Sequence, residues 1–305
     1  MAEATRAQDG RLDPSVLDSL GGLSLVARTV VEGFMAGQHR SPLRGSSVEF
    51  AQHRQYVPGD ELRKLDWKIF ARNNRLVVKE FVEETNFSCH LLVDASASMS
   101  FGSLGWTKFD YARWAAAALG HLVLAQRDAA GLVLFDDDVR SKVSPANGQH
   151  QAVAITQTLE EATPNGATGV GEVLSWIGGR LSRKGIVAVF SDFFDDEQAL
   201  IDGMRRLTHA GHEPILFQVL DPQELEFDYA QLLRLEGLEG GGRLKVDPKA
   251  LRIAYREAIR SHQETLARQA QKLSVDFVSL ETSKPLDVTL STYLAHRIAR
   301  ARVGG

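Results

Sequence analysis

From Phe87 onward, short apolar runs alternate with segments whose apolar residues recur at helical spacing. The strand-like runs are CHLLVD (89–94), AAGLVLFD (129–136), GIVAVFSD (185–192), EPILFQVLD (213–221) and VDFVSLET (275–282). Helical patterns lie between the first four runs, over residues 108–126, 150–162, 169–181 and 196–211. This alternation predicts an α/β fold, with a Rossmann-like central parallel sheet covered by helices on both faces.

Three further segments complete the predicted organisation. Residues 45–84 read as a strand, a Pro58-Gly59 turn, a short helix beginning near Asp60, an Asn73-Asn74 turn and a second strand, which together predict a small N-terminal β-rich lobe. A glycine-rich β-hairpin is expected within an insertion at about 223–247, followed by helices over 250–273 and 289–302. We therefore expect two domains: residues 1–86, with an N-terminal helix and the lobe, and residues 87–305.

Composition narrows the class of protein. The 305 residues carry a formal net charge of −4, which gives no bulk electrostatic reason to expect nucleic acid or an anionic membrane as partner. The single cysteine, Cys89, lies inside an apolar run and suits a reducing cytoplasm. The N-terminus lacks the pattern of a signal peptide. The apolar stretch 20–37 is interrupted by Arg28 and Glu32 and is too short to span a bilayer, so we expect an amphipathic helix packed on the body of a cytoplasmic protein.

Two of the apolar runs end in an aspartate. Asp94 closes HLLVD and is followed by Ser96 and Ser98, whereas Asp192 closes VAVFSD. Between them in the chain, Thr168 precedes a predicted helix. In an open parallel sheet, ligands bind outside the carboxyl ends of the strands, near the point where the strand order reverses. We therefore expect these five side chains on one edge of the sheet.

Two explanations fit these oxygen-bearing side chains. Asp94 or a following serine could cap the next helix by accepting hydrogen bonds from its first N–H groups. Alternatively, carboxylate and hydroxyl oxygens suit a hard cation such as Mg²⁺, which takes about six oxygen ligands and would keep one position for an outside group.

The segment DASAS resembles the DxSxS motif of von Willebrand factor A domains, with Thr168 and Asp192 where that family's other metal-site residues are expected. The resemblance implies a metal-ion-dependent adhesion site that uses Asp94, Ser96, Ser98, Thr168 and Asp192, and whose open position accepts a carboxylate from a partner protein. Mg²⁺, Mn²⁺ and Ca²⁺ all accept such ligands, and with two carboxylates we expect modest affinity, so that the free protein can lack the metal. One departure is Phe193, where glycine is frequent in the family.

A second resemblance covers GSSVEFAQHRQYVPGDELRKLDWKIFARNNRLVVKEF, which is similar to the signature of an uncharacterised bacterial family, the domain of unknown function number fifty-eight. The resemblance implies an association with a MoxR-type AAA+ ATPase acting in protein assembly or maturation. The charged and aromatic residues of this segment indicate either an ion-pair scaffold with Trp67 packed inside it or a docking face, since Arg, Tyr and Trp dominate interface hot spots. The candidate partner-binding residues are Arg54, Tyr56, Asp60, Arg63, Asp66, Trp67 and Arg72.

The sequence thus favours a non-enzymatic protein–protein interaction module or adaptor. The alternative is a metal-dependent phosphoryl-transfer enzyme with Asp94 as nucleophile. Phosphatases of the haloacid dehalogenase type need a second aspartate two residues later, and Ser96 stands at that position. Nucleic-acid binding through the basic residues between 63 and 79 is disfavoured because acidic residues are interspersed among them.

Overall fold

The computed structural model describes residues 14–20, 22–37, 50–57, 67–73, 75–81, 88–181, 184–229, 233–236, 243–246 and 248–303. The chain divides into a larger unit of residues 1–41 and 88–305 and a smaller unit of residues 42–87. The larger unit therefore contains the N-terminal helices α1 (Pro14–Ser19) and α2 (Leu23–Gly37). This division differs from the expected boundary, which joined the N-terminal helix to the lobe.

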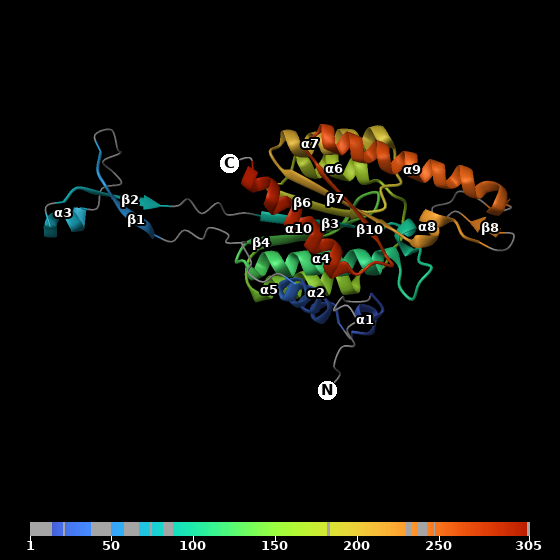
Figure 1. Cartoon of the computed structure of the whole chain (residues 1–305), viewed down its shortest axis with the longest axis horizontal. Coiled ribbons are helices and arrows are strands. Elements are labelled where there is room, and N and C mark those ends of the chain that lie inside the picture. The colour runs from blue at the N-terminus through green and yellow to red at the C-terminus, as the bar shows by residue number, and fades with distance from the viewer. Residues whose placement is uncertain are drawn as a thin grey trace. The chain divides into compact units, whose positions relative to one another are not determined.

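A six-stranded sheet forms the centre of the larger unit (Figure 1), in the order β10-β7-β6-β3-β4-β5. Its strands are β3 (Ser88–Asp94), β4 (Ala129–Phe135), β5 (Val139–Ala146), β6 (Gly185–Ser191), β7 (Glu213–Leu220) and β10 (Asp276–Glu281). All neighbouring strands run parallel except β4 and β5. This is the doubly wound strand order, which reverses between β3 and β6. The predicted α/β fold with a mainly parallel sheet is confirmed.

The antiparallel edge strand β5 is absent from the sequence-based assignment. Its residues are alternately half-buried and exposed, unlike the continuously buried residues of β3. It also contains Pro145, which cannot donate to a strand ladder and is tolerated at an edge. The pattern of buried parallel strands therefore did not reveal it.

Helices cover both faces of the sheet (Figure 1). One face carries α2, α4 (Lys108–Ala125), α5 (Gln149–Glu161) and α10 (Leu286–Val303), and the other carries α6 (Val170–Gly178), α7 (Glu197–His209) and α9 (Pro248–Lys272). Along β3, Leu91 and Val93 belong to the first core cluster, and Leu92 belongs to the second. All three are fully buried. Each such burial contributes about 2 kcal/mol to folding, before conformational entropy is subtracted.

Helix α2 packs on α4 through an apolar face. Val26, Ala27 and Val30 are at most 2% exposed and belong to the same core cluster as α4. Arg28 and Glu32 form an ion pair on the exposed side of the helix. The predicted amphipathic helix packed on the body of the protein is confirmed, and this packing explains why α2 groups with the larger unit.

The smaller unit contains β1 (Phe50–Gln55), α3 (Trp67–Asn73) and β2 (Val77–Phe81), with the two strands antiparallel. This matches the expected strand, helix and strand, although the predicted helix start near Asp60 lies outside the described residues.

In the larger unit, a short helix α8 (Pro222–Glu226) precedes the antiparallel pair β8 (Leu233–Glu236) and β9 (Arg243–Val246), so the predicted hairpin is present. Among the described residues, no helix has both the length and the apolar character that crossing a membrane requires.

Candidate functional site

The site lies at the carboxyl ends of the two strands between which the strand order reverses. Asp94 is the last residue of β3, and Asp192 directly follows β6. Both side chains are buried, with 0% of each residue exposed. The parallel pairing of β3 with β6 brings Ser191 beside Asp94, and the Ser191 hydroxyl donates a hydrogen bond of 2.6 Å to Asp94 Oδ2. The sheet topology thus places the two predicted carboxylates together.

The loop after β3 gathers three of the predicted residues. The backbone N–H of Ser96 donates to Asp94 Oδ1 over 2.8 Å, and the hydroxyl oxygens of Ser96 and Ser98 lie 3.1 Å apart. Ser98 belongs to a short 3₁₀ helix over Ala97–Ser100. The next α-helix, α4, is capped instead by Thr107, whose hydroxyl accepts a hydrogen bond from the backbone of Asp110. Capping of α4 therefore does not account for Asp94 or the two serines.

Thr168 lies in a segment that contacts this loop. The backbone of Asn165 donates to the carbonyl of Ala95 over 2.7 Å, and the backbone of Ala97 donates to the carbonyl of Gly166 over 2.9 Å. Thr168 is half-buried, directly before the Gly169 cap of α6. The structure thus brings the loop of Thr168 against the loop of Asp94.

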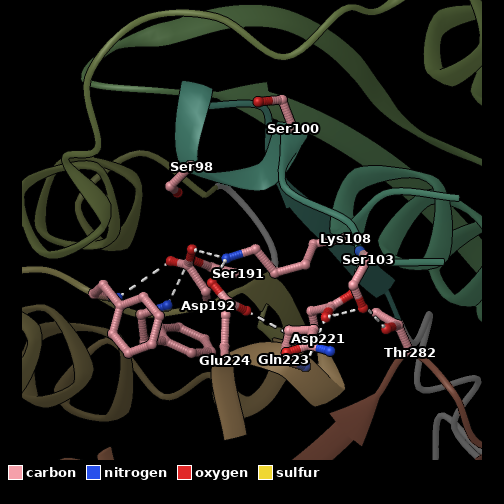
Figure 2. A network of polar contacts seen from close by, with 12 residues as sticks. Ser98, Ser100, Ser103, Lys108, Ser191, Asp192, Asp221, Gln223, Glu224 and Thr282 are labelled. Atoms are coloured by element: carbon pink, nitrogen blue, oxygen red, sulfur yellow. Dashed lines mark hydrogen bonds and ion pairs between the residues drawn. The ribbon is translucent and has the colours of Figure 1, made fainter. Parts of the chain in front are cut away.

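Lys108 is a site residue that sequence reasoning missed. Its Nζ lies 2.7 Å from Asp192 Oδ2 and 2.6 Å from Glu224 Oε1, and its side chain is only 1% exposed. Figure 2 shows Lys108 reaching from α4 to these two carboxylates. A sequence signal existed, because a lysine in the first turn of a helix interacts unfavourably with the helix dipole, and an acidic partner would offset this. Its partners could not be named before α4, β6 and α8 were brought together.

The two strand-end carboxylates therefore have different environments. Among the residues that the structure describes, none forms an ion pair with Asp94, and burial together with the charge of Asp192 raises the pKa of Asp94 to about 7. Asp192, in contrast, holds the ammonium of Lys108. Burial lowers the pKa of Lys108, but attraction to Asp192 and Glu224 outweighs this and leaves the pKa raised. Lys108 therefore stays charged.

Phe193, the departure noted in the sequence, adopts a backbone φ of 58°. This left-handed conformation favours glycine and costs other residues about 1–2 kcal/mol. The Phe193 side chain is fully buried in the second core cluster, and its carbonyl lies 3.1 Å from His262 Nε2. Packing of the ring thus holds the chain in the conformation that glycine would adopt more easily.

The residues of the site fit a divalent cation on the Asp94 side. A buried carboxylate with a raised pKa, beside a second carboxylate, would be stabilised by a positive charge. Within the described part of the chain, no group of three or more His, Cys, Asp or Glu side chains is placed to hold a metal. Any metal here would therefore also need hydroxyl oxygens, of the kind that Ser96, Ser98 and Thr168 offer.

The phosphoryl-transfer alternative requires an acid two residues after Asp94. A nucleophilic carboxylate of that kind depends on a nearby proton donor for the leaving group. Ser96 occupies the position where the alternative mechanism requires an acid.

The candidate binding residues of the smaller unit are described in part. Trp67 is 58% exposed, and its ring meets that of Phe70 edge-on, so Trp67 is not buried inside the lobe. Tyr56 is half-buried, and Arg72 is exposed on α3. Arg54 lies in β1. Asp60, Arg63 and Asp66 fall outside the described residues.

Comparison with known proteins gives a family match. The model of the family described as "Protein of unknown function DUF58" matches residues 52–265. The chain is 28% identical over 300 residues to "Uncharacterized protein Rv1480" of Mycobacterium tuberculosis, covering 96% of this chain and 93% of that protein. "Uncharacterized protein Mb1516" of Mycobacterium bovis matches with the same figures.

Solved structures with similarity to the chain include the conserved hypothetical protein BatB from Bacteroides thetaiotaomicron. That match has a TM-score of 0.47 and 13% identity, and covers 69% of this chain and 98% of BatB. The SpRpn10 VWA domain matches with a TM-score of 0.41 and 14% identity, covering 67% of this chain and 93% of that domain. Similarity at this level carries no information about function.

Proposed function

Because the chain belongs to the DUF58 family, whose description assigns no activity, we propose a function from the site at the ends of β3 and β6. The protein is a non-enzymatic interaction module in which a divalent cation, Mg²⁺ or one of its relatives Mn²⁺ and Ca²⁺, links the chain to a carboxylate of a partner protein. Asp94 provides the charge for the cation, and Ser96, Ser98 and Thr168 provide neutral oxygens.

The observation that carries this proposal is the buried, unneutralised carboxylate of Asp94 beside two neighbouring hydroxyls. Its pKa is raised to about 7, so the anion is unfavourable there until a cation reaches it. Ser98 and Thr168 are half-buried, whereas Asp94 and Asp192 are fully buried. The open side of a bound cation would therefore lie toward the hydroxyls, where a partner's carboxylate can approach.

The smaller unit supplies a second candidate contact. Trp67 is 58% exposed and Arg72 is exposed on the same helix, and these residue types dominate interface hot spots. The resemblance of this segment makes a MoxR-type AAA+ ATPase the first partner to test.

A pull-down from the native cell tests the proposal. The intact chain is used with Mg²⁺, with chelator, and as the variants Asp94→Asn and Asp137→Asn, the last being an exposed aspartate just after β4. We expect a partner that is retained by the wild type and Asp137→Asn with Mg²⁺ and is lost with chelator or Asp94→Asn. Equal retention in all four samples would contradict a metal-dependent contact.

Trp67→Ala, tested in the same pull-down, separates the two contacts. If the lobe also binds the partner, this variant loses retention even with Mg²⁺ present and Asp94 intact. Retention equal to the wild type would limit binding to the larger unit.

A further inference from the structure

Lys108 brings a positive charge to the same strand ends where the metal is proposed. The ammonium lies within 2.7 Å of one oxygen on each of Asp192 and Glu224. Because only 1% of the Lys108 side chain is exposed, water neutralises little of its charge. The ammonium therefore depends on these carboxylates and binds one of the expected metal ligands.

The position of the ammonium is restricted from several sides. It lies 5.9 Å from the ring centroid of Phe101 and 5.5 Å from that of Phe194, within the range of cation–π attraction. Its second partner, Glu224, belongs to helix α8, where Asp221 and Glu224 form a reciprocal capping box. Figure 2 shows this network of Lys108, Asp192, Glu224 and Asp221. Moving the ammonium would disturb two helices and two aromatic contacts.

Asp192 is already paired with a positive charge, whereas Asp94 has no such partner among the described residues. The Oδ2 of Asp192 accepts from Lys108 over 2.7 Å, and its Oδ1 accepts from the backbone of Phe194 over 3.2 Å. Within the described part of the chain, the hydrogen bonds to Asp94 come from neutral groups, such as the N–H of Ser96 and the hydroxyl of Ser191. Of the two carboxylates, one is thus neutralised by the protein itself.

We propose that Lys108 is an internal competitor of the metal: it holds Asp192 away from direct coordination and lowers the affinity of the site for a divalent cation. The metal is then held from the Asp94 side, by that carboxylate and the hydroxyls. This inference rests on the proposed metal site and specifies how strongly that site binds. The ammonium acts in two ways, through like-charge repulsion of the cation and by occupying an oxygen that could otherwise become a ligand.

Titration with Mn²⁺, with the free ion measured by electron paramagnetic resonance, tests the inference on the full-length chain. Lys108→Gln removes the charge but keeps an N–H donor for the two carboxylates. We expect it to bind Mn²⁺ at least about tenfold more tightly than the wild type, since a nearby positive charge is lost and Asp192 is no longer paired with an ammonium. Lys108→Arg keeps the charge and should stay within about threefold of the wild type. Equal or weaker binding by Lys108→Gln overturns the inference.

Asp192→Asn provides a test that does not need Lys108 to be replaced. If the ion pair with Lys108 keeps Asp192 from coordinating the metal, Asp192→Asn weakens Mn²⁺ binding far less than Asp94→Asn does. Equal losses in the two variants would overturn the inference. In the Lys108→Gln background, Asp192→Asn should cost at least about tenfold more affinity than in the wild type, because Asp192 has then become a ligand.

The failure of this inference can be told apart from failure of the proposed function. If Lys108→Gln binds Mn²⁺ more tightly than the wild type, as expected, but no partner is retained in the pull-down, only the partner-binding role is refuted. Metal-dependent partner retention with unchanged affinity in Lys108→Gln would refute only the role of Lys108. Absence of Mn²⁺ binding to every variant overturns both.

Discussion

Replacing Lys108 by Met should destabilise the larger unit by about 3–4 kcal/mol. Methionine fills much the same volume as the lysine stem, so the change removes charge without opening a large cavity. The two carboxylates on the ammonium then lose their counter-charge. Asp192 has a fully buried side chain, whereas that of Glu224 is 14% exposed, so most of the loss comes from Asp192.

The magnitude follows from this burial. Breaking a buried ion pair by removing one partner costs about 3–5 kcal/mol, because a charge is left in a poorly hydrated place. Partial hydration of Glu224 places the expected value toward the lower end of that range. The double variant Lys108→Met/Asp192→Asn removes both members of the more deeply buried pair, and should therefore recover at least about half of the loss.

Urea unfolding in the absence of divalent cations measures these differences. Far-UV circular dichroism follows the whole chain. Tryptophan fluorescence reports mainly on the larger unit, which contains Trp106, Trp114 and Trp176 of the four tryptophans. Unchanged m-values would show that the variants differ in stability and not in the surface exposed on unfolding. A loss below about 1 kcal/mol for Lys108→Met, or a double variant no more stable than the single one, would refute the reasoning.

Three further predictions concern Phe193, Gly171 and Asp94. Because φ of residue 193 is 58°, the variant Phe193→Gly should be more stable than Phe193→Ala by about 1 kcal/mol, although both variants lose the buried ring. A urea unfolding experiment in which Phe193→Ala is the more stable variant would contradict the backbone argument. Gly171→Ala should destabilise the protein by about 2–3 kcal/mol, because a Cβ there would lie 2.4 Å from the backbone of α7. The control Gly179→Ala has open space around the added Cβ and should change the stability by less than about 1 kcal/mol. Equal shifts of the thermal unfolding midpoint in the two variants would contradict this packing. The pKa of Asp94 is raised by burial and by Asp192 from 3.8 to about 7, so its contribution to stability is fully present below pH 3.8 and is lost as the pH rises through about 7 without metal. Asp94→Asn should flatten that decline in urea unfolding across this window, and an unchanged slope would contradict the shift.

Much of the sheet was predictable because its parallel strands are buried on both faces and leave continuous apolar runs. The ends of those runs also indicated where Asp94 and Asp192 lie, since carboxyl ends of parallel strands share one edge. The edge strand β5 was missed because its half-exposed alternation includes Pro145. The N-terminal helix was correctly expected to pack on the body. Its grouping with the larger unit follows from its contacts with α4, α5 and α10, which the sequence alone does not show.

The charge arrangement of the site was not predictable from spacing. Lys108 begins the helix after the DASAS loop, but its partners come from β6 and α8, which are distant in the chain. Only the folded structure shows that Asp192 is neutralised internally and that Asp94 is not. Phe193 is a similar case. Its positive φ could be expected, because glycine is frequent at this position in the family that the sequence resembles. The burial of its ring, which holds the backbone in that conformation, could not be expected from the sequence.

The most direct test of a metal held by Asp94 is anomalous scattering from a crystal of the protein grown with Mn²⁺. We predict a single strong anomalous peak within coordination distance of Asp94 and the hydroxyls of Ser96 and Ser98. The ion pair between Lys108 and Asp192 should remain in that crystal structure. Strong Mn²⁺ peaks elsewhere and none beside Asp94 would contradict the metal site.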